Sequence, residues 1–230
     1  SYMMLMVVCL LPIVLDWIWT VVDLLYVNSI VHVMNRTRKT GSKNLNLFYL
    51  HEDPIKSAEL HCDKHVVKMI IEYAQMLSTA HRMLDGEQIT AIQNGRRIQR
   101  WNLNGDKDLH TLEMQTTLYK ASHINHPSTK WVRENAIQYQ YAYDMFVALC
   151  DEYTYRYGKV HLTDKKLRKL LNNLPNNITL GVYSDPPQCM PDDVKTESTI
   201  TAYHKYYAVY KKDFAKWTSR PVPNFMEAYA

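Results

Sequence analysis

The chain has 230 residues, of which 47% are hydrophobic, enough for one well-buried domain and too many for a disordered polypeptide. Its formal net charge of +4 permits contact with phosphate backbones but does not by itself identify a nucleic-acid-binding protein. The four cysteines (Cys9, Cys62, Cys150 and Cys189) are far apart and form no CxxC pair, which argues against a disulfide scaffold or a zinc knuckle and favours a cytoplasmic protein.

Residues 1–43 differ in composition from the rest of the chain. They are mostly apolar and end in a basic linker, and three interpretations are open: a membrane segment within residues 1–35, an additional packed helix, or a wrongly assigned start. Asp16 and Asp23 interrupt the apolar run, and charges near the middle of a membrane span are costly. The folded domain is expected to comprise residues 44–230.

This domain is predicted to be mainly α, a compact multi-helix unit with little or no sheet. The run NLFYL at Asn46–Leu50 is short, aromatic and apolar, as expected of a single strand or an extended entry segment. Asp53 is then a suitable N-cap with Pro54 at the first helical position, and a helical pattern continues to Gly86. We expect one helix of about 30 residues over this stretch.

The segment at 86–125 is polar and is predicted to form loops and a shorter helix. Three further helices are predicted downstream, each with a capping or terminating signal. They run from Ser128 or Thr129 to Gly158, from Thr163 to the residues before Pro175, and over about residues 194–217.

The first long helix carries a narrow line of polar side chains. At about 100° per residue these side chains fall within a sector of roughly 80°, and the rest of the circumference is apolar. The line consists of His61, His65, Lys68, Glu72, Gln75 and Thr79. Because unpaired buried charges cost several kcal/mol, the line must either border a cleft or bond to neighbouring helices. We interpret it as the wall of a cleft.

Three chemistries could use this polar line. His61 and His65 are four residues apart, as ligands of a metal would be, although the HExxH pattern is absent. Glu72 could act in acid–base catalysis. The amine of Lys68, one turn from Glu72, could instead form a Schiff base with a sugar. The last two interpretations need neither a metal nor another cofactor.

Several stretches resemble one enzyme family. DKHVVKMIIE (Asp63–Glu72) resembles the helix of the small phage pyrimidine-dimer DNA glycosylases of the endonuclease V type, in which a histidine precedes the catalytic glutamate by seven residues. NLFYL is similar to the segment before that helix. AYHKYYAVY (Ala202–Tyr210) is similar to the aromatic C-terminal segment that those enzymes lay against DNA. The resemblance extends loosely over residues 46–217 and places His65 and Glu72 at the two family positions.

This resemblance implies a base-excision glycosylase and lyase acting on phage or cellular DNA. Glu72 would stabilise the sugar cation or the imine, and His65 and His61 would orient the substrate or move protons. In the family the nucleophile is the α-amino group of the processed N-terminus, whereas here about 45 residues precede NLFYL. Either the mature protein starts later, or Lys68 supplies the amine, or lyase activity is absent.

A glycosylase also needs a surface that holds phosphates and bases, and DNA is a better expected partner than RNA. Basic runs such as RRIQR (Arg96–Arg100) and KKLRK (Lys165–Lys169) could contribute to it. The candidate nucleic-acid-binding residues are Arg133, Arg156, His126, Tyr203, Lys205, Tyr206 and Tyr207. Two alternatives are open: a non-catalytic nucleic-acid-binding accessory protein, and a metal-dependent hydrolase that uses His61 and His65.

Overall fold

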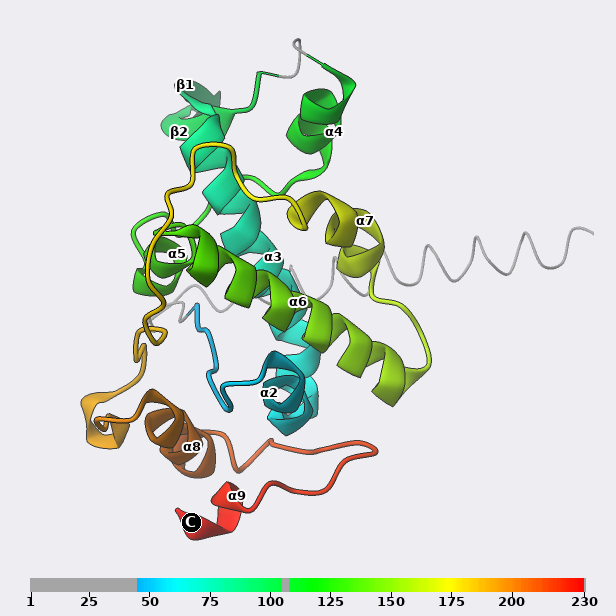
Figure 1. Cartoon of the computed structure of the whole chain (residues 1–230), viewed down its shortest axis with the longest axis vertical. Helices are drawn as coiled ribbons and strands as arrows, with labels where there is room; N and C mark the ends of the chain where they lie inside the picture. Colours follow the sequence, from blue (N-terminus) through cyan, green and yellow to red (C-terminus); the bar gives the residue numbers. More distant parts are fainter. Residues whose placement is uncertain (1–44, 105–107, 230) are drawn as a thin grey trace, which may run out of the picture. The chain divides into compact units, whose positions relative to one another are not determined.

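The computed structural model describes residues 45–104 and 108–229 (Figure 1), so the predicted apolar segment lies outside them. Among these residues helices predominate and one two-stranded sheet is present, which confirms the mainly α prediction. No helix in this part of the chain is both long and apolar enough to cross a membrane. The elements are α2 (Pro54–Leu60), α3 (Asp63–Asp85), β1 (Glu87–Gln93), β2 (Arg96–Asn102), α4 (Leu109–Thr117), α5 (Pro127–Val132), α6 (Ala136–Tyr157), α7 (Leu162–Leu171), the 3₁₀ turn η1 (Asp192–Val194), α8 (Thr199–Tyr210) and α9 (Phe225–Ala228).

The predicted first helix is interrupted, and the prediction of one continuous helix was wrong. Its ends are as expected, because the Asp53 side chain accepts a hydrogen bond from an amide of α2 and α3 ends at Gly86. Between α2 and α3, however, His61 and Cys62 have extended backbone conformations. The His61 ring is hydrogen-bonded through Nδ1 to the Ser57 carbonyl at 2.7 Å, which satisfies a carbonyl at the end of α2. His61 therefore terminates α2 and does not belong to α3.

The predicted second long helix is also two helices. Its start is capped by His126, whose Nδ1 accepts from the Ser128 amide, and not by Ser128 or Thr129. Asn135 then caps α6 separately by accepting from two amides of its first turn. The end of α6 is as predicted, since Gly158 has φ of +67°, a left-handed conformation that glycine adopts without steric cost. The last predicted helix is shorter than expected and corresponds to α8.

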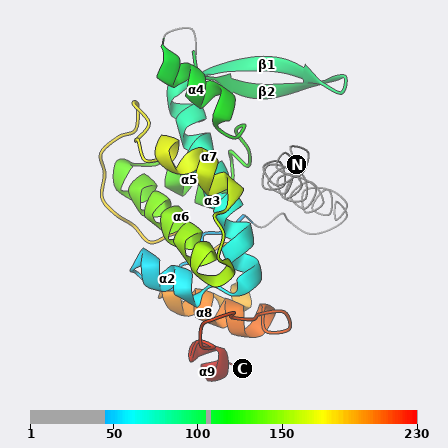
Figure 2. The same ribbon diagram turned by 90° about the vertical axis from the view of Figure 1, so that its right-hand side faces the viewer.

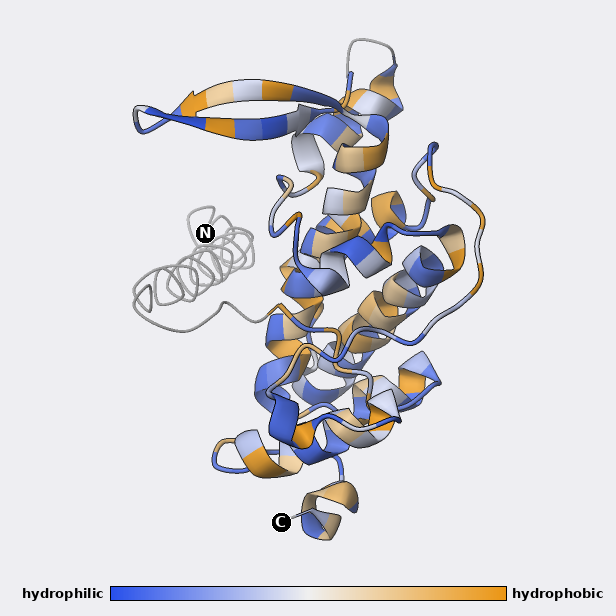
Figure 3. Ribbon diagram, turned by 90° about the vertical axis from the view of Figure 1, so that its left-hand side faces the viewer, coloured by the Kyte–Doolittle hydropathy of each residue, from blue (hydrophilic) through white to orange (hydrophobic). Residues whose placement is uncertain are grey.

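A β-hairpin occupies part of the segment that was predicted as loop and helix. Strands β1 and β2 pair antiparallel, with Ile89 opposite Arg100 and Gln93 opposite Arg96. Asn94 and Gly95 connect them with positive φ values of 50° and 73°, the conformation of a type I′ turn. The hairpin extends away from the helices (Figure 2), and its strands alternate between hydrophilic and hydrophobic residues (Figure 3).

Helices α3 and α6 form the centre of the described domain, with α2 and α7 packed on them. The extended segment Leu45–Leu50 is buried in the same core, which agrees with the extended alternative predicted for NLFYL. Each fully buried large apolar side chain contributes about 1.5–3 kcal/mol. The core is also rich in tyrosine, and four of these rings are among its largest fully buried side chains: Tyr73, Tyr139, Tyr203 and Tyr207.

Candidate functional site

The N-terminal part of the polar line is closed by neighbouring side chains. His65 is buried, and its Nδ1 is hydrogen-bonded to the Tyr207 hydroxyl. The Phe48 ring stacks on the imidazole at a centroid distance of 4.3 Å. Burial, reinforced by neighbouring positive charges, holds the pKa of His65 well below its ordinary value. His65 is thus a neutral core histidine in this conformation.

His61 does not share a helix with His65, so the expected pair of ligands one helical turn apart is wrong. Burial lowers the pKa of His61 to about 4, and the Arg156 charge adds to this effect. No group of three or more histidine, cysteine, aspartate or glutamate side chains in the described ranges is placed to hold a metal ion. The arrangement of these residues therefore does not support the metal-dependent hydrolase.

The C-terminal part of the line is closed as well. Thr79 donates to the Gln75 carbonyl at 2.7 Å and accepts from the Ser122 amide at 3.2 Å. One turn further along α3, Arg82 continues the line, and all its hydrogen-bond donors are used within the domain. Sequence reasoning missed Arg82, although its position three residues after Thr79 placed it on the same side of the helix.

The middle of the line remains accessible at Lys68 and Glu72. Lys68 Nζ lies 2.8 Å from Glu72 Oε1, and the two side chains are 38% and 12% exposed. The second carboxylate oxygen of Glu72 is buried and has no hydrogen-bond partner among the described residues. The structure thus brings together the two groups that the Schiff-base interpretation requires.

The environment of Glu72 changes its acidity. Burial raises the pKa of this carboxyl, while Lys68 and the backbone amide of Asn46 oppose the increase. A carboxylate whose pKa is raised is a better proton acceptor near neutral pH than an exposed glutamate. Asn46 belongs to the buried segment Leu45–Leu50, so this extended segment passes beside the carboxylate.

Arg156 is not available for phosphate binding, and that prediction was wrong. Its side chain is fully buried and donates to Glu152 at 2.6 Å and to Asp63 at 2.9 Å. A third bond goes to the Glu59 carbonyl at 3.0 Å. Arg156 thus joins α2, α3 and α6 inside the domain.

The tyrosines of α8 do not form a surface on which bases could stack. Tyr203, Tyr206 and Tyr207 are all buried, and the Tyr203 hydroxyl donates to Asn46 Oδ1 at 2.9 Å. Helical spacing placed them on the core face, which explains why the expectation of exposed rings was wrong. Lys205 of the same helix is half-buried, with its ammonium over the Tyr229 ring.

His126 and Arg133 lie at the two ends of α5. His126 is the N-cap, and burial together with His123 lowers its pKa. Arg133 donates through Nη2 to the Ile124 carbonyl at 2.7 Å, whereas its buried Nη1 has no partner in the described ranges. Burial lowers the pKa of Arg133. Both residues have structural roles here, and their binding to phosphate remains a prediction.

Two cavities of about 350 Å³ each lie at the junction of α3 with the hairpin. One is bordered by the hairpin and Arg82, and the other by Asp85, Asn102 and Asn176. Glu72 is not among the residues that line either cavity. The expected cleft along the polar line is therefore narrower than predicted and consists of the exposed surface at Lys68 and Glu72.

No protein-family model, no curated protein and no solved structure matches this chain. The comparisons therefore add neither a family nor a fold relative. The function must be inferred from the residues and their geometry alone.

The buried His61 makes stability dependent on acid pH. Its folded-state pKa of about 4 is below the unfolded value of 6.5, so the unfolded state binds the proton first and stability is lost as pH falls from 6.5 to 4. We expect the loss to be on the order of 3 kcal/mol. Replacing His61 by leucine should flatten the pH dependence of the melting temperature over this interval, measured by circular dichroism. An unchanged slope would show that His61 is solvated in solution, and the exposed His110 replaced by glutamine is the control.

Proposed function

We propose that this protein is a DNA base-excision glycosylase in which Glu72 and an adjacent amine act on the sugar C1′. The observation that carries the proposal is the Lys68–Glu72 pair at 2.8 Å, half-way along a polar line whose two ends are closed. The resemblance of Asp63–Glu72 to the histidine-to-glutamate helix of the pyrimidine-dimer glycosylases supports the same assignment.

The reaction would begin when the amine gives a proton to Glu72 and attacks C1′. The glycosidic bond then breaks, and the base leaves with the bonding electron pair and takes up a proton. Loss of a second proton from the nitrogen and departure of O4′, which is protonated as it leaves, give an iminium ion between the protein and C1′. Glu72 would supply and accept these protons and stabilise the positive charge, a contribution worth typically 10²- to 10⁴-fold in rate.

Two amines could serve as the nucleophile. Lys68 is one, because its Nζ lies next to the carboxylate and its side chain is partly exposed. The other is an α-amino group created by processing just before Asn46, because the Asn46 amide lies close enough to Glu72 to affect its pKa. In either case the carboxylate and the chemistry are the same.

Borohydride trapping tests the proposal directly. Full-length protein is incubated with a duplex that contains either an abasic site or an ultraviolet-induced pyrimidine dimer, and sodium borohydride is added. Hydride addition to C1′ converts the iminium into a stable secondary amine, so a covalent protein–DNA band is expected. Peptide mapping by mass spectrometry then distinguishes Lys68 from a processed α-amine. Absence of a band on both substrates contradicts the lyase mechanism.

A non-catalytic nucleic-acid-binding protein is the second candidate. The closed ends of the polar line favour it, because His65 and Thr79 are hydrogen-bonded within the domain in the manner of structural residues. In that case the protein binds DNA without releasing bases. A glycosylase assay that detects free base separates the two candidates.

A further inference from the structure

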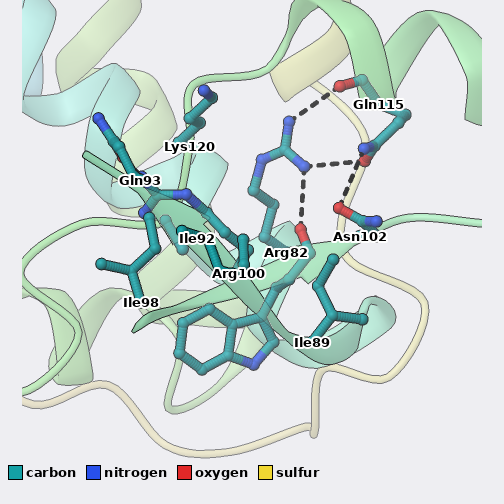
Figure 4. A pocket seen from close by; sticks show the side chains of 12 residues that line it. Arg82, Ile89, Ile92, Gln93, Ile98, Arg100, Asn102, Gln115 and Lys120 are labelled. Carbon is teal, nitrogen blue, oxygen red and sulfur yellow. Dashed lines mark hydrogen bonds between the residues drawn. The ribbon is translucent and has the colours of Figure 1, made fainter. Parts of the chain in front are cut away.

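The hairpin forms one wall of a cavity with an apolar floor and a basic rim. Half-buried Ile89 and Ile98 contribute to the floor, and Arg100 and Lys120 lie at the edge (Figure 4). None of the residues that line this cavity is an aspartate or a glutamate. Its volume of about 350 Å³ lies within the range of small-ligand sites.

The wall of this cavity also contains a buried positive charge that no carboxylate balances. Arg82 is 4% exposed and donates five hydrogen bonds, all to neutral oxygens. The acceptors are the carbonyls of Tyr119, Trp101, Gln115 and Leu118 and the side-chain oxygen of Gln115. No ion pair involves Arg82 in the part of the chain that the structure describes. Since an arginine stays protonated, the cavity favours an anion.

Further positive charges continue along the hairpin beyond the cavity. The β2 strand carries Arg96, Arg97 and Arg100, whereas Glu87 is the one acidic residue of the two strands. Arg96 and Arg100 are four residues apart and lie on the same face, with Ile98 between them, about 13 Å from end to end. A row of cations at such spacings matches a polymer with repeated negative charges better than it matches a small anion.

We infer that this hairpin face binds a single-stranded nucleic acid. Phosphates would lie against Arg96, Arg100 and Lys120, and an unpaired base would occupy the apolar floor at Ile89 and Ile98. A duplex offers phosphates but keeps its bases stacked inside, so it would leave the floor unused. Binding at the hairpin does not require catalysis by Glu72, because the cavity and Glu72 have no lining residue in common.

The test is the affinity of full-length protein for a fluorescein-labelled 20-mer of thymidylate, measured by anisotropy over a salt series. Replacing Arg96, Arg97 and Arg100 together by glutamine should weaken binding at least tenfold. It should also reduce the slope of log affinity against log salt by about 2, at roughly 0.7 per lost phosphate contact. Ile98→Ser should weaken binding about fivefold or more without changing the salt slope, because it removes base contact only.

A matched control removes the same number of charges elsewhere. Lys165, Lys166 and Lys169 are exposed on α7, and their triple replacement by glutamine should leave the affinity within twofold. Equal losses in both triple variants would mean that binding is non-specific and would overturn the inference. So would effective competition by polyglutamate, which would indicate an acidic protein partner, or tighter binding of a 20-base-pair duplex that depends on the same arginines.

These measurements use undamaged DNA without a lesion, so their outcome is independent of borohydride trapping. Loss of trapping with intact thymidylate binding would contradict the glycosylase proposal alone. Intact trapping with no effect of the hairpin variants would contradict single-strand binding by the hairpin alone. Melting temperatures of the variants are expected to stay within a few degrees of the original protein, because the three arginine side chains are at the surface or half-exposed.

Discussion

Glu72→Gln is expected to abolish borohydride trapping and base release while the protein still binds DNA. Glutamine keeps the shape of the side chain but can neither accept the proton from the amine nor stabilise the iminium charge. The expected decrease in the rate of adduct formation is at least about 10²-fold. Single-turnover kinetics on an abasic duplex measure this rate, and anisotropy measures binding separately.

The control for this variant is Glu197→Gln, which changes an exposed glutamate distant in sequence from the polar line. It should leave both measurements unchanged. Glu72→Gln should also leave the melting temperature nearly unchanged, because one carboxylate oxygen already lacks a partner and the Lys68 side chain can reach solvent. Trapping at the original rate in Glu72→Gln would remove this residue from the mechanism. A large drop in melting temperature with no change in rate would support the non-catalytic candidate.

Arg156→Gln is expected to cause a larger loss of stability than either His61→Leu or Glu72→Gln. The guanidinium is fully buried and paired with Glu152 and Asp63, so its removal leaves carboxylates without their counter-charge. Breaking a buried pair in this way costs about 3–5 kcal/mol. For a domain of this size the melting temperature should fall by roughly 6–20 °C, since each kcal/mol corresponds to about 2–4 °C.

The pH dependence of this variant provides a second measurement. Burial tends to raise the pKa values of Asp63 and Glu152, but their hydrogen bonds and the nearby arginines outweigh it and lower both. Their stabilising contribution is therefore present above the unfolded values of 3.8 and 4.5 and is lost as pH falls below them. Arg156→Gln should reduce this loss between pH 5 and pH 3. Arg168→Gln removes a partly exposed pair and should cost no more than about 1 kcal/mol.

Local sequence signals predicted the ends of the helices better than their continuity. Asp53, Gly86 and Gly158 act where the pattern placed them, because a cap or a left-handed glycine depends on residues within one turn. The interruption at His61 was not predicted, because it depends on a side chain that bonds to a carbonyl of its own helix. Apolar periodicity continued through the break and concealed it.

The hairpin was predictable and was missed. Asn94–Gly95 between two alternating runs is the strongest short-range hairpin signal, but the polar composition of residues 86–125 was given more weight. The closure of the polar line could not be predicted in the same way. Tyr207 closes on His65 from 142 residues away, and Ser122 closes on Thr79 from 43 residues away. A helical projection shows which residues share a face but not what covers that face.

Helix α3 joins the two proposed sites through a rigid length of backbone. Ten residues separate Glu72 from Arg82, which is about 15 Å along the helix axis. At Gly86 an added Cβ would lie 2.4 Å from the Arg82 carbonyl oxygen, so the strand must leave the helix where no side chain intervenes. The distance between chemistry and grip is thus set by the helix and does not depend on a flexible linker. A strand held by the hairpin would present to Glu72 a nucleotide about four or five positions away, at 3.4 Å per nucleotide in a B-form geometry.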